Sequence, residues 1–244
     1  NHLYYVQSRP VISDYEFDKL LEELIRLEKE HPELATPDSP TQQVGGGITR
    51  EFMQVPHRYP MLSLGNTYSE EEVREFTERV AKAAGDRVEY VCEQKFDGVA
   101  IGLTYRGGRL VQAVTRGDGV RGDDVTANVK TIRSIPLKLH GQGYPDEFEI
   151  RGEIILPHAS FEKMNARRAE EGEEPFANPR NAASGSLKMQ DSAEVAKRGL
   201  DGFFYYIPGN VLPVATHYEC LAAARSWGFK VSEFAVRCAS LIEI

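Results

Sequence analysis

Two consecutive glycines, Gly107 and Gly108, separate two apolar runs that have the composition of β-strands. The runs cover residues 99–105 and 109–115 and are rich in β-branched and other apolar side chains. A two-residue connection can join neighbouring strands only when they are antiparallel, because parallel strands need a long crossover. The sequence therefore predicts an antiparallel hairpin near the middle of the chain and excludes a sheet of parallel strands alone.

Further periodic segments lie on both sides of this hairpin. Alternating or apolar runs predict strands at residues 88–93, 148–155 and 203–207. Start and stop signals predict a helix from Ser69 to Gly85 and two later helices at residues 158–171 and 216–227. Hairpins mixed with helices are typical of an α+β domain with an antiparallel sheet, and they argue against a doubly wound fold.

The first segment of the chain has a different character. Ser13 and Glu16 have the spacing of a capping box, and apolar residues follow at helical intervals until His31-Pro32, where the helix should end. A loop rich in proline and glycine then covers residues 36–47. We therefore expect a small helical subdomain at residues 1–44, followed by a larger domain at residues 45–244. A helix of this length buries little by itself, so it should dock on its neighbour or move.

Composition narrows the class of protein. The 244 residues carry a net charge of −8, and no apolar run is long enough to cross a bilayer, so we expect a cytoplasmic protein without a membrane partner. Three widely spaced cysteines and six scattered histidines argue against a disulfide framework and a zinc site, and we assign no metal ligand. The chain has no initiator methionine and ends without a cap, so we expect a piece of a longer protein.

The segment Lys95-Phe96-Asp97-Gly98 is the first candidate for chemistry. If the strand predicted at residues 88–93 continues through it, alternation places Glu93, Lys95 and Asp97 on one face. A lysine between two carboxylates, followed by a glycine that permits close approach, is unusual for a structural strand. The motif alone is weak evidence, because a lone lysine is usually part of a solvated ion pair.

Other polar and aromatic groups follow at intervals. Arg116 lies in a loop of glycines and acids that suits sugar hydroxyls and phosphates. Alternation places Arg151 and Glu153 on one face of a strand, and residues 177–183 form a polar turn that holds Arg180. The aromatic run at residues 203–206 offers rings that could stack on a base. The chain has neither a GxGxxG nor a Walker motif, so nucleotide binding by those two routes is not supported.

Taken in order, these motifs resemble those of the NAD-dependent DNA ligases of bacteria. The K-x-D-G motif of nucleotidyltransferases matches residues 95–98, R-G-E matches residues 151–153, and N-P-R-N-A-A matches residues 178–183. The N-terminal piece, with Tyr4-Tyr5, residues 14–18 and residues 36–41, looks like the small domain that binds the nicotinamide mononucleotide (NMN) half of NAD in this family. The resemblance implies an ATP-grasp-like nucleotidyltransferase domain preceded by that subdomain.

The resemblance also implies a mechanism and a set of site residues. Lys95 is the expected nucleophile: its amine attacks the adenylyl phosphate of NAD, NMN leaves, and AMP later passes to the 5′-phosphate of a DNA nick. The family's nucleotide-binding positions correspond to Ser63, Leu64, Glu93, Asp97, Arg116, Glu153 and Tyr205, the last packing on adenine. The NMN subsite corresponds to Tyr4, Asp14, Tyr15, Glu16, Phe17 and Asp18. For Asp14 and Asp18, the alternative is favourable charge in the first turn of a helix.

Partners and alternatives complete the prediction. The resemblance implies Mg²⁺ as a cofactor, a monomeric chain, and nicked duplex DNA as the partner of the full-length protein. Lys188 stands where some members have arginine, which replaces a bidentate phosphate contact by a point charge. Because later motifs of the family lie beyond residue 244, we expect weak nucleotide binding without ligation by this piece alone. An ATP-dependent ligase or capping-type nucleotidyltransferase, and a non-catalytic nucleotide or nucleic-acid-binding module, are the alternatives.

Overall fold

A four-stranded antiparallel sheet lies at the centre of the computed structural model, which describes residues 11–36, 38–41, 51–85 and 88–244. The strand order is β4-β3-β6-β7, and every neighbouring pair is antiparallel. The strands are β3 (Val99–Arg106), β4 (Arg109–Thr115), β6 (Glu147–Ile155) and β7 (Asp201–Tyr206). Gly107 and Gly108 have φ values of 55° and 72°, as the two-residue hairpin between β3 and β4 requires. The predicted hairpin and fold class are confirmed.

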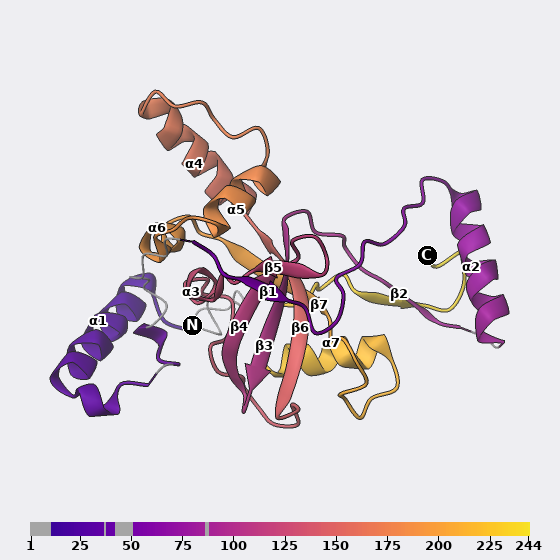
Figure 1. Cartoon of the computed structure of the whole chain (residues 1–244), viewed down its shortest axis with the longest axis horizontal. Helices are drawn as coiled ribbons and strands as arrows, with labels where there is room; N and C mark the ends of the chain where they lie inside the picture. The colour runs from indigo at the N-terminus through magenta and orange to yellow at the C-terminus, as the bar shows by residue number, and fades with distance from the viewer. Residues whose placement is uncertain (1–10, 37, 42–50, 86–87) are drawn as a thin grey trace.

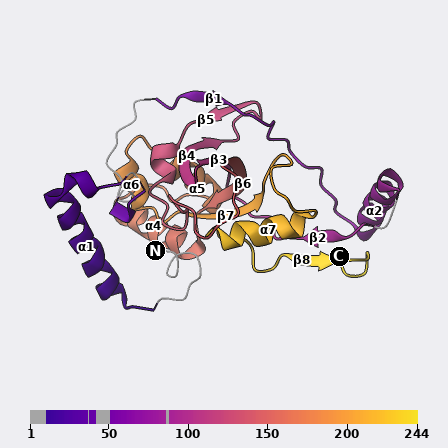
Figure 2. The ribbon, with the colours of Figure 1, turned by 90° about the horizontal axis from the view of Figure 1, so that it is seen from below.

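Two pairs of short strands accompany this sheet. β1 (Gln54–Pro56) pairs with β5 (Arg121–Asp123), and β2 (Tyr90–Cys92) pairs with β8 (Val236–Cys238). Figures 1 and 2 show β1 and β5 across one face of the central sheet and α7 (His217–Ser226) along the other. The strand predicted at residues 88–93 is confirmed but shorter, because β2 covers only Tyr90–Cys92, and it belongs to a separate two-stranded sheet.

The helices largely follow their sequence signals. Ser13 caps α1 (Asp14–Glu30) with the complete capping box, and Ser69 caps α2 (Glu70–Ala84), which ends at Gly85 in the left-handed conformation. α4 (His158–Glu170) and α7 also match their predicted ranges within one residue. The remaining helical segments are η2 (Pro32–Leu34), α3 (Thr126–Val129), α5 (Pro179–Leu187) and α6 (Ser192–Ala196).

One helix corrects the sequence analysis. Residues 177–183 were expected to form a polar turn, but α5 begins within them at Pro179. Asn178 is the N-cap and its side chain accepts a hydrogen bond from the backbone of Asn181, while proline occupies the first turn, where no N–H is needed. The polar residues are therefore the start of a helix, and Ala182, Ala183 and Leu187 are buried behind them.

The two faces of the central sheet differ in composition. Cross-strand register places Ile101, Leu103 and Tyr105 on the same face as Phe148 and Ile150, and this face is buried. Aromatic rings from Trp227 and Phe229, after α7, cover that face. The opposite face carries Ala100 and Gly102 beside Glu153 and Arg151. Small residues next to charged ones leave room on that face, which carries the candidate site.

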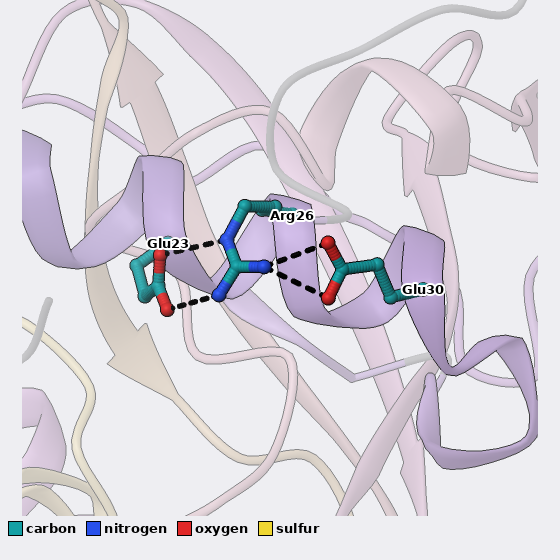
Figure 3. Close-up of polar contacts among 3 residues, drawn as sticks. All are labelled: Glu23, Arg26 and Glu30. Carbon is teal, nitrogen blue, oxygen red and sulfur yellow. Dashed lines mark hydrogen bonds and ion pairs between the residues drawn. The ribbon is translucent and has the colours of Figure 1, made fainter.

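α1 lies at one end of the molecule and α2 at the other (Figures 1 and 2). The exposed face of α1 carries a bridge of ion pairs in which Arg26 contacts both Glu23 and Glu30 at 2.6 Å (Figure 3). Exposed pairs of this kind contribute about 0.3–0.5 kcal/mol each. Leu20 and Leu27 are also exposed, so these two side chains contribute little apolar burial to α1.

Candidate functional site

The segment that carries Lys95 is an irregular connection between β2 and β3. The expected alternation of Glu93, Lys95 and Asp97 on one strand face is therefore wrong. Side-chain contacts hold the segment instead of a strand ladder: Glu93 Oε2 lies 2.8 Å from His217 Nε2, and Gln94 Oε1 accepts a hydrogen bond of 3.1 Å from Ser232. The Lys95 side chain is exposed between these contacts and the sheet.

Phe96 and Gly98 attach the same segment to the central sheet. The Phe96 ring stacks on Phe203 of β7, with 4.1 Å between the ring centroids. Gly98 donates its N–H to Glu153 Oε1 at 3.2 Å, and a Cβ at this position would lie 2.1 Å from the carbonyl oxygen of Ile154. Only glycine permits this approach, so the glycine of the K-x-D-G motif sets the distance between Lys95 and β6.

Glu153 lies at the centre of the charged side chains on the open face. Burial raises the pKa of Glu153, while the N–H of Gly98 and the positive charges of Lys95 and Arg180 act in the opposite direction. Asp97, which also faces Glu153, raises it further. Asp97 is itself paired with Arg180 at 3.3 Å. The structure thus brings Lys95, Asp97 and Glu153 together, with Arg180 beside them.

Tyr205 joins this group from β7. Burial, together with the charge of Glu153, raises the pKa of Tyr205 to about 12. Its hydroxyl hydrogen-bonds to Glu153, and the positive charges of Arg151 and Arg116 partly oppose the shift. The phenol is therefore within electrostatic reach of the R-G-E strand and of Arg116. The prediction that Arg151 and Glu153 share one strand face is confirmed by their register opposite Gly102 and Ala100.

The pairing of β1 with β5 brings Ser63 to Arg116, whereas Leu64 has no such contact within the described residues. Beyond β1, the backbone N–H of His57 bonds to Val120 and that of Met61 bonds to Gly119, so this segment runs along the loop that contains Arg116. Arg116 Nη1 lies 3.4 Å from Ser63 Oγ. Leu64 is 91% exposed. The loop and the segment therefore meet although Ser63 and Arg116 are far apart in the sequence.

Hydrogen bonds from Arg151 hold the segment that carries Ser63. Its guanidinium donates to the carbonyl oxygens of Tyr59 at 2.6 Å and Pro60 at 2.9 Å, and it pairs with Glu149 at 2.7 Å. The Arg151 side chain is 9% exposed, so a substitution would leave two carbonyls and a buried carboxylate without their donor. The arginine of the R-G-E motif is a positioning residue for the segment that carries Ser63.

Sequence reasoning missed two contacts. His217 was not a candidate, because no local pattern connects the first residue of α7 to Glu93, 124 positions earlier. Arg180 was noted only as part of a polar turn, although it pairs with Asp97. Lys188, which departs from the arginine of some family members, pairs with Asp123 at 2.6 Å.

Of the side chains expected in the NMN subsite, the structure describes only that of Glu16. Tyr4 lies outside the described residues, as do the side chains of Asp14, Tyr15, Phe17 and Asp18. Glu16 is the described member, and its carboxylate accepts hydrogen bonds of 2.8 Å from both the N–H and the hydroxyl of Ser13. These bonds lower the pKa of Glu16 and use its charge at the helix start.

The described part of the chain shows neither a metal-binding cluster nor a helix suited to cross a membrane. Its residues contain no cluster of three or more His, Cys, Asp or Glu side chains that could hold a metal ion by themselves. None of the helices within it combines the length and the apolar character that a membrane crossing requires.

Comparison with known proteins covers the whole chain. The family model of the NAD-dependent DNA ligase adenylation domain matches residues 49–244, and that of the DNA ligase-like N-terminal NAD+-binding domain matches residues 1–45. Curated proteins named DNA ligase match at 58% identity in Parabacteroides distasonis, 58% in Cytophaga hutchinsonii and 57% in Phocaeicola vulgatus, each over 100% of this chain. The chain spans 37%, 36% and 37% of those relatives. By these matches, the chain belongs to the NAD-dependent DNA ligase family and carries its adenylation domain.

Proposed function

We propose that this chain catalyses the first step of NAD-dependent DNA ligation, in which Lys95 takes an adenylyl group from NAD. The observation that carries the proposal is the convergence on one sheet face of Glu153, Tyr205 and Arg116 beside the exposed Lys95. An amine, carboxylates, a guanidinium and an aromatic ring are the groups that a nucleotide with a reactive phosphate requires.

The step itself needs only bond exchange at one phosphorus atom. The neutral amine of Lys95 attacks the α-phosphorus on the adenylate side of NAD, and an N–P bond forms as the bond to the bridging oxygen breaks. NMN leaves with the electron pair of the broken bond, and the nitrogen releases one proton to water. Arg116 is suited to neutralise charge that develops on phosphate oxygens, whereas Glu93 and Glu153 are suited to accept hydrogen bonds from the nucleoside. Tyr205 offers a ring face for adenine.

We assign residues 1–44 to the NMN half of NAD and residues 45–244 to adenylation. The family models, which meet between residues 45 and 49, support this division. Within the first part, Tyr4, Asp14, Tyr15, Phe17 and Asp18 remain our candidate NMN contacts. Glu16 is a weaker candidate, because its carboxylate is already bound to Ser13.

Mg²⁺ is proposed as the metal of this reaction. It usually binds one or two carboxylates together with substrate phosphates and retained waters, and Asp97 and Glu153 lie close enough to influence each other electrostatically. These two residues would hold the ion, which would neutralise charge on the phosphates. The full-length protein is proposed to act as a monomer on nicked duplex DNA. The name DNA ligase of its relatives supports DNA as the partner.

Intact-mass measurement tests the adenylation step. The chain is incubated with NAD and Mg²⁺, and we expect a mass increase of one adenylyl group that maps to Lys95. The Lys95→Ala variant should lose the adduct but still bind NAD in a calorimetric titration, whereas Lys82→Ala, on the exposed side of α2, should keep both. Chelation of Mg²⁺ should abolish the adduct.

The alternatives give different outcomes in the same experiment. An adduct formed from ATP and not from NAD would indicate an ATP-dependent nucleotidyltransferase. NAD binding without any adduct, combined with salt-dependent binding of duplex DNA, would indicate a non-catalytic module and contradict the proposed role of Lys95.

A further inference from the structure

We propose that Cys92 and Cys238 form a redox-active dithiol, which a peroxide oxidises to an intrachain disulfide. The two Sγ atoms lie 3.4 Å apart, although the residues are 146 positions apart in the sequence. Both cysteines are free thiols in the structure. This inference does not depend on the proposed function.

Strand pairing brings the two thiols to one face. In the β2–β8 pair, Tyr90 lies opposite Cys238 and Cys92 lies opposite Val236. Side chains alternate along a strand, so Tyr90, Cys92, Val236 and Cys238 point to the same side. A disulfide has an S–S distance of about 2.0 Å, so each sulfur must move by less than about 1 Å to form it.

The surroundings favour oxidation over metal binding. Within the described residues, no group of three or more His, Cys, Asp or Glu side chains is placed to complete a metal site around this pair. Cys92 is partly exposed and Cys238 is 2% exposed, so a small oxidant can reach Cys92 first. Burial and the neighbouring Cys238 raise the pKa of Cys92, so the reaction is expected to be slow at neutral pH.

The chemistry balances with one peroxide. The Cys92 thiolate attacks a peroxide oxygen, the O–O bond breaks, and protonation of the leaving hydroxide gives water and a sulfenic acid. The sulfur of Cys238 then attacks the Cys92 sulfur, the S–O bond breaks, and the Cys238 proton leaves with hydroxide as a second water. Two thiols and one hydrogen peroxide thus yield one disulfide and two waters, and a dithiol reductant reverses the bond by exchange.

A bond between Cys92 and Cys238 would restrict the segment that carries Lys95. Cys92 is the last residue of β2, three positions before Lys95, and β8 belongs to the C-terminal part of the chain. A covalent link between β2 and β8 would hold the start of the Lys95 segment to β8 even when the strand hydrogen bonds open. The bond would also close the long loop between Cys92 and Cys238, which lowers the conformational entropy of the unfolded chain.

The Cys220→Ser variant provides the cleanest test, because it leaves only the proposed pair. After treatment with hydrogen peroxide, we expect the intact mass to fall by two hydrogen atoms, both free thiols to disappear, and the chain to remain a monomer on a non-reducing gel. Peptide mapping should link the segments that contain Cys92 and Cys238. Dithiothreitol should restore both thiols, and the oxidised form should have the higher midpoint of thermal unfolding.

Two matched variants control for simple oxidation. Cys92→Ser and Cys238→Ser, each combined with Cys220→Ser, cannot form the intrachain bond and should gain oxygen or couple between chains. The proposal is overturned if the Cys220→Ser variant gains oxygen without losing hydrogen, or if its disulfides join separate chains.

Discussion

At the scale of single residues, the site depends on a half-buried acid, Glu153, that interacts with several of its charged and aromatic neighbours. Glu153 accepts the N–H of Gly98, hydrogen-bonds to Tyr205 and faces the charges of Lys95 and Arg180. Burial nevertheless dominates and raises the pKa of Glu153 above its ordinary value of 4.5. The charged form of Glu153 is therefore less stable in the folded protein than in the unfolded chain, which costs stability once the group ionises.

Replacing Glu153 by Gln should remove the loss of folding stability that accompanies ionisation of Glu153. The folded pKa is raised, so the unfolding midpoint of the native protein should fall, relative to Glu153→Gln, as pH rises from about 4.5 through the folded pKa. The variant keeps an oxygen for Gly98 but carries no charge. Thermal unfolding of both proteins across this pH range measures the difference. Glu162→Gln, at an exposed position of α4, is the control and should show no such trend; a constant difference for Glu153→Gln would contradict the argument.

At the scale of secondary-structure elements, helix caps place residues of the site. Thr216 and Glu219 form a complete capping box at the start of α7, and Glu219 Oε2 accepts from both the N–H and the hydroxyl of Thr216 at 3.0 Å. His217 is the first residue of that helix and meets Glu93. The cap therefore determines where the imidazole lies as well as how stable the helix is.

Loss of this cap should affect ligand binding as well as stability. We expect Thr216→Ala to destabilise the protein by about 1 kcal/mol and to weaken NAD binding through the displaced His217–Glu93 contact. Ser69→Ala removes the N-cap of α2, which makes no contact with Glu93, so it should lower stability by a similar amount and leave NAD binding unchanged. Thermal unfolding and calorimetric titration separate the two effects. Equal NAD affinity in both variants would show that the α7 cap has no positioning role.

At the scale of the whole molecule, residues 38–41 attach α1 to the central sheet within the described part of the chain. Asp38 forms an ion pair with Arg109 at the start of β4, and Thr41 hydrogen-bonds to Glu28 of α1. Burial alone would raise the pKa of Asp38, but its hydrogen bonds with Arg109 and Thr36 leave it lowered. The Asp38 side chain is 10% exposed, so the charge depends on its partner. The ion pair between Asp38 and Arg109 is thus a specific contact through which the helical part docks on the central sheet.

Arg109→Ala should release this attachment. Removal of the guanidinium leaves a buried carboxylate unpaired, which costs about 1–3 kcal/mol and should speed amide hydrogen exchange in α1 and the following segment by about tenfold or more. Exchange in β6 and β7 should change little. Arg106→Ala, which removes an exposed pair with Glu147 at the other end of the hairpin turn, is the matched control. Unchanged exchange in α1 would show that the ion pair does not hold it.

Local sequence rules determined the elements of this protein and many members of its site. Capping boxes, the Gly-Gly turn and alternation along β6 act over a few residues, so their outcome can be read without the fold. Recognition of the family motifs added the identity of Lys95 as the expected nucleophile. The N-cap signal of Asn178-Pro179 was also present in the sequence but was interpreted as a turn.

Only the tertiary structure decided which distant groups meet. The pairing of β1 with β5 brings Ser63 to Arg116, α7 brings His217 to Glu93, and β8 brings Cys238 to Cys92. It also ended β2 at Cys92, because side-chain contacts from α7 and Ser232 replace the ladder that a longer strand would need. Such contacts depend on packing between segments that are more than 50 residues apart, and no local periodicity encodes that register.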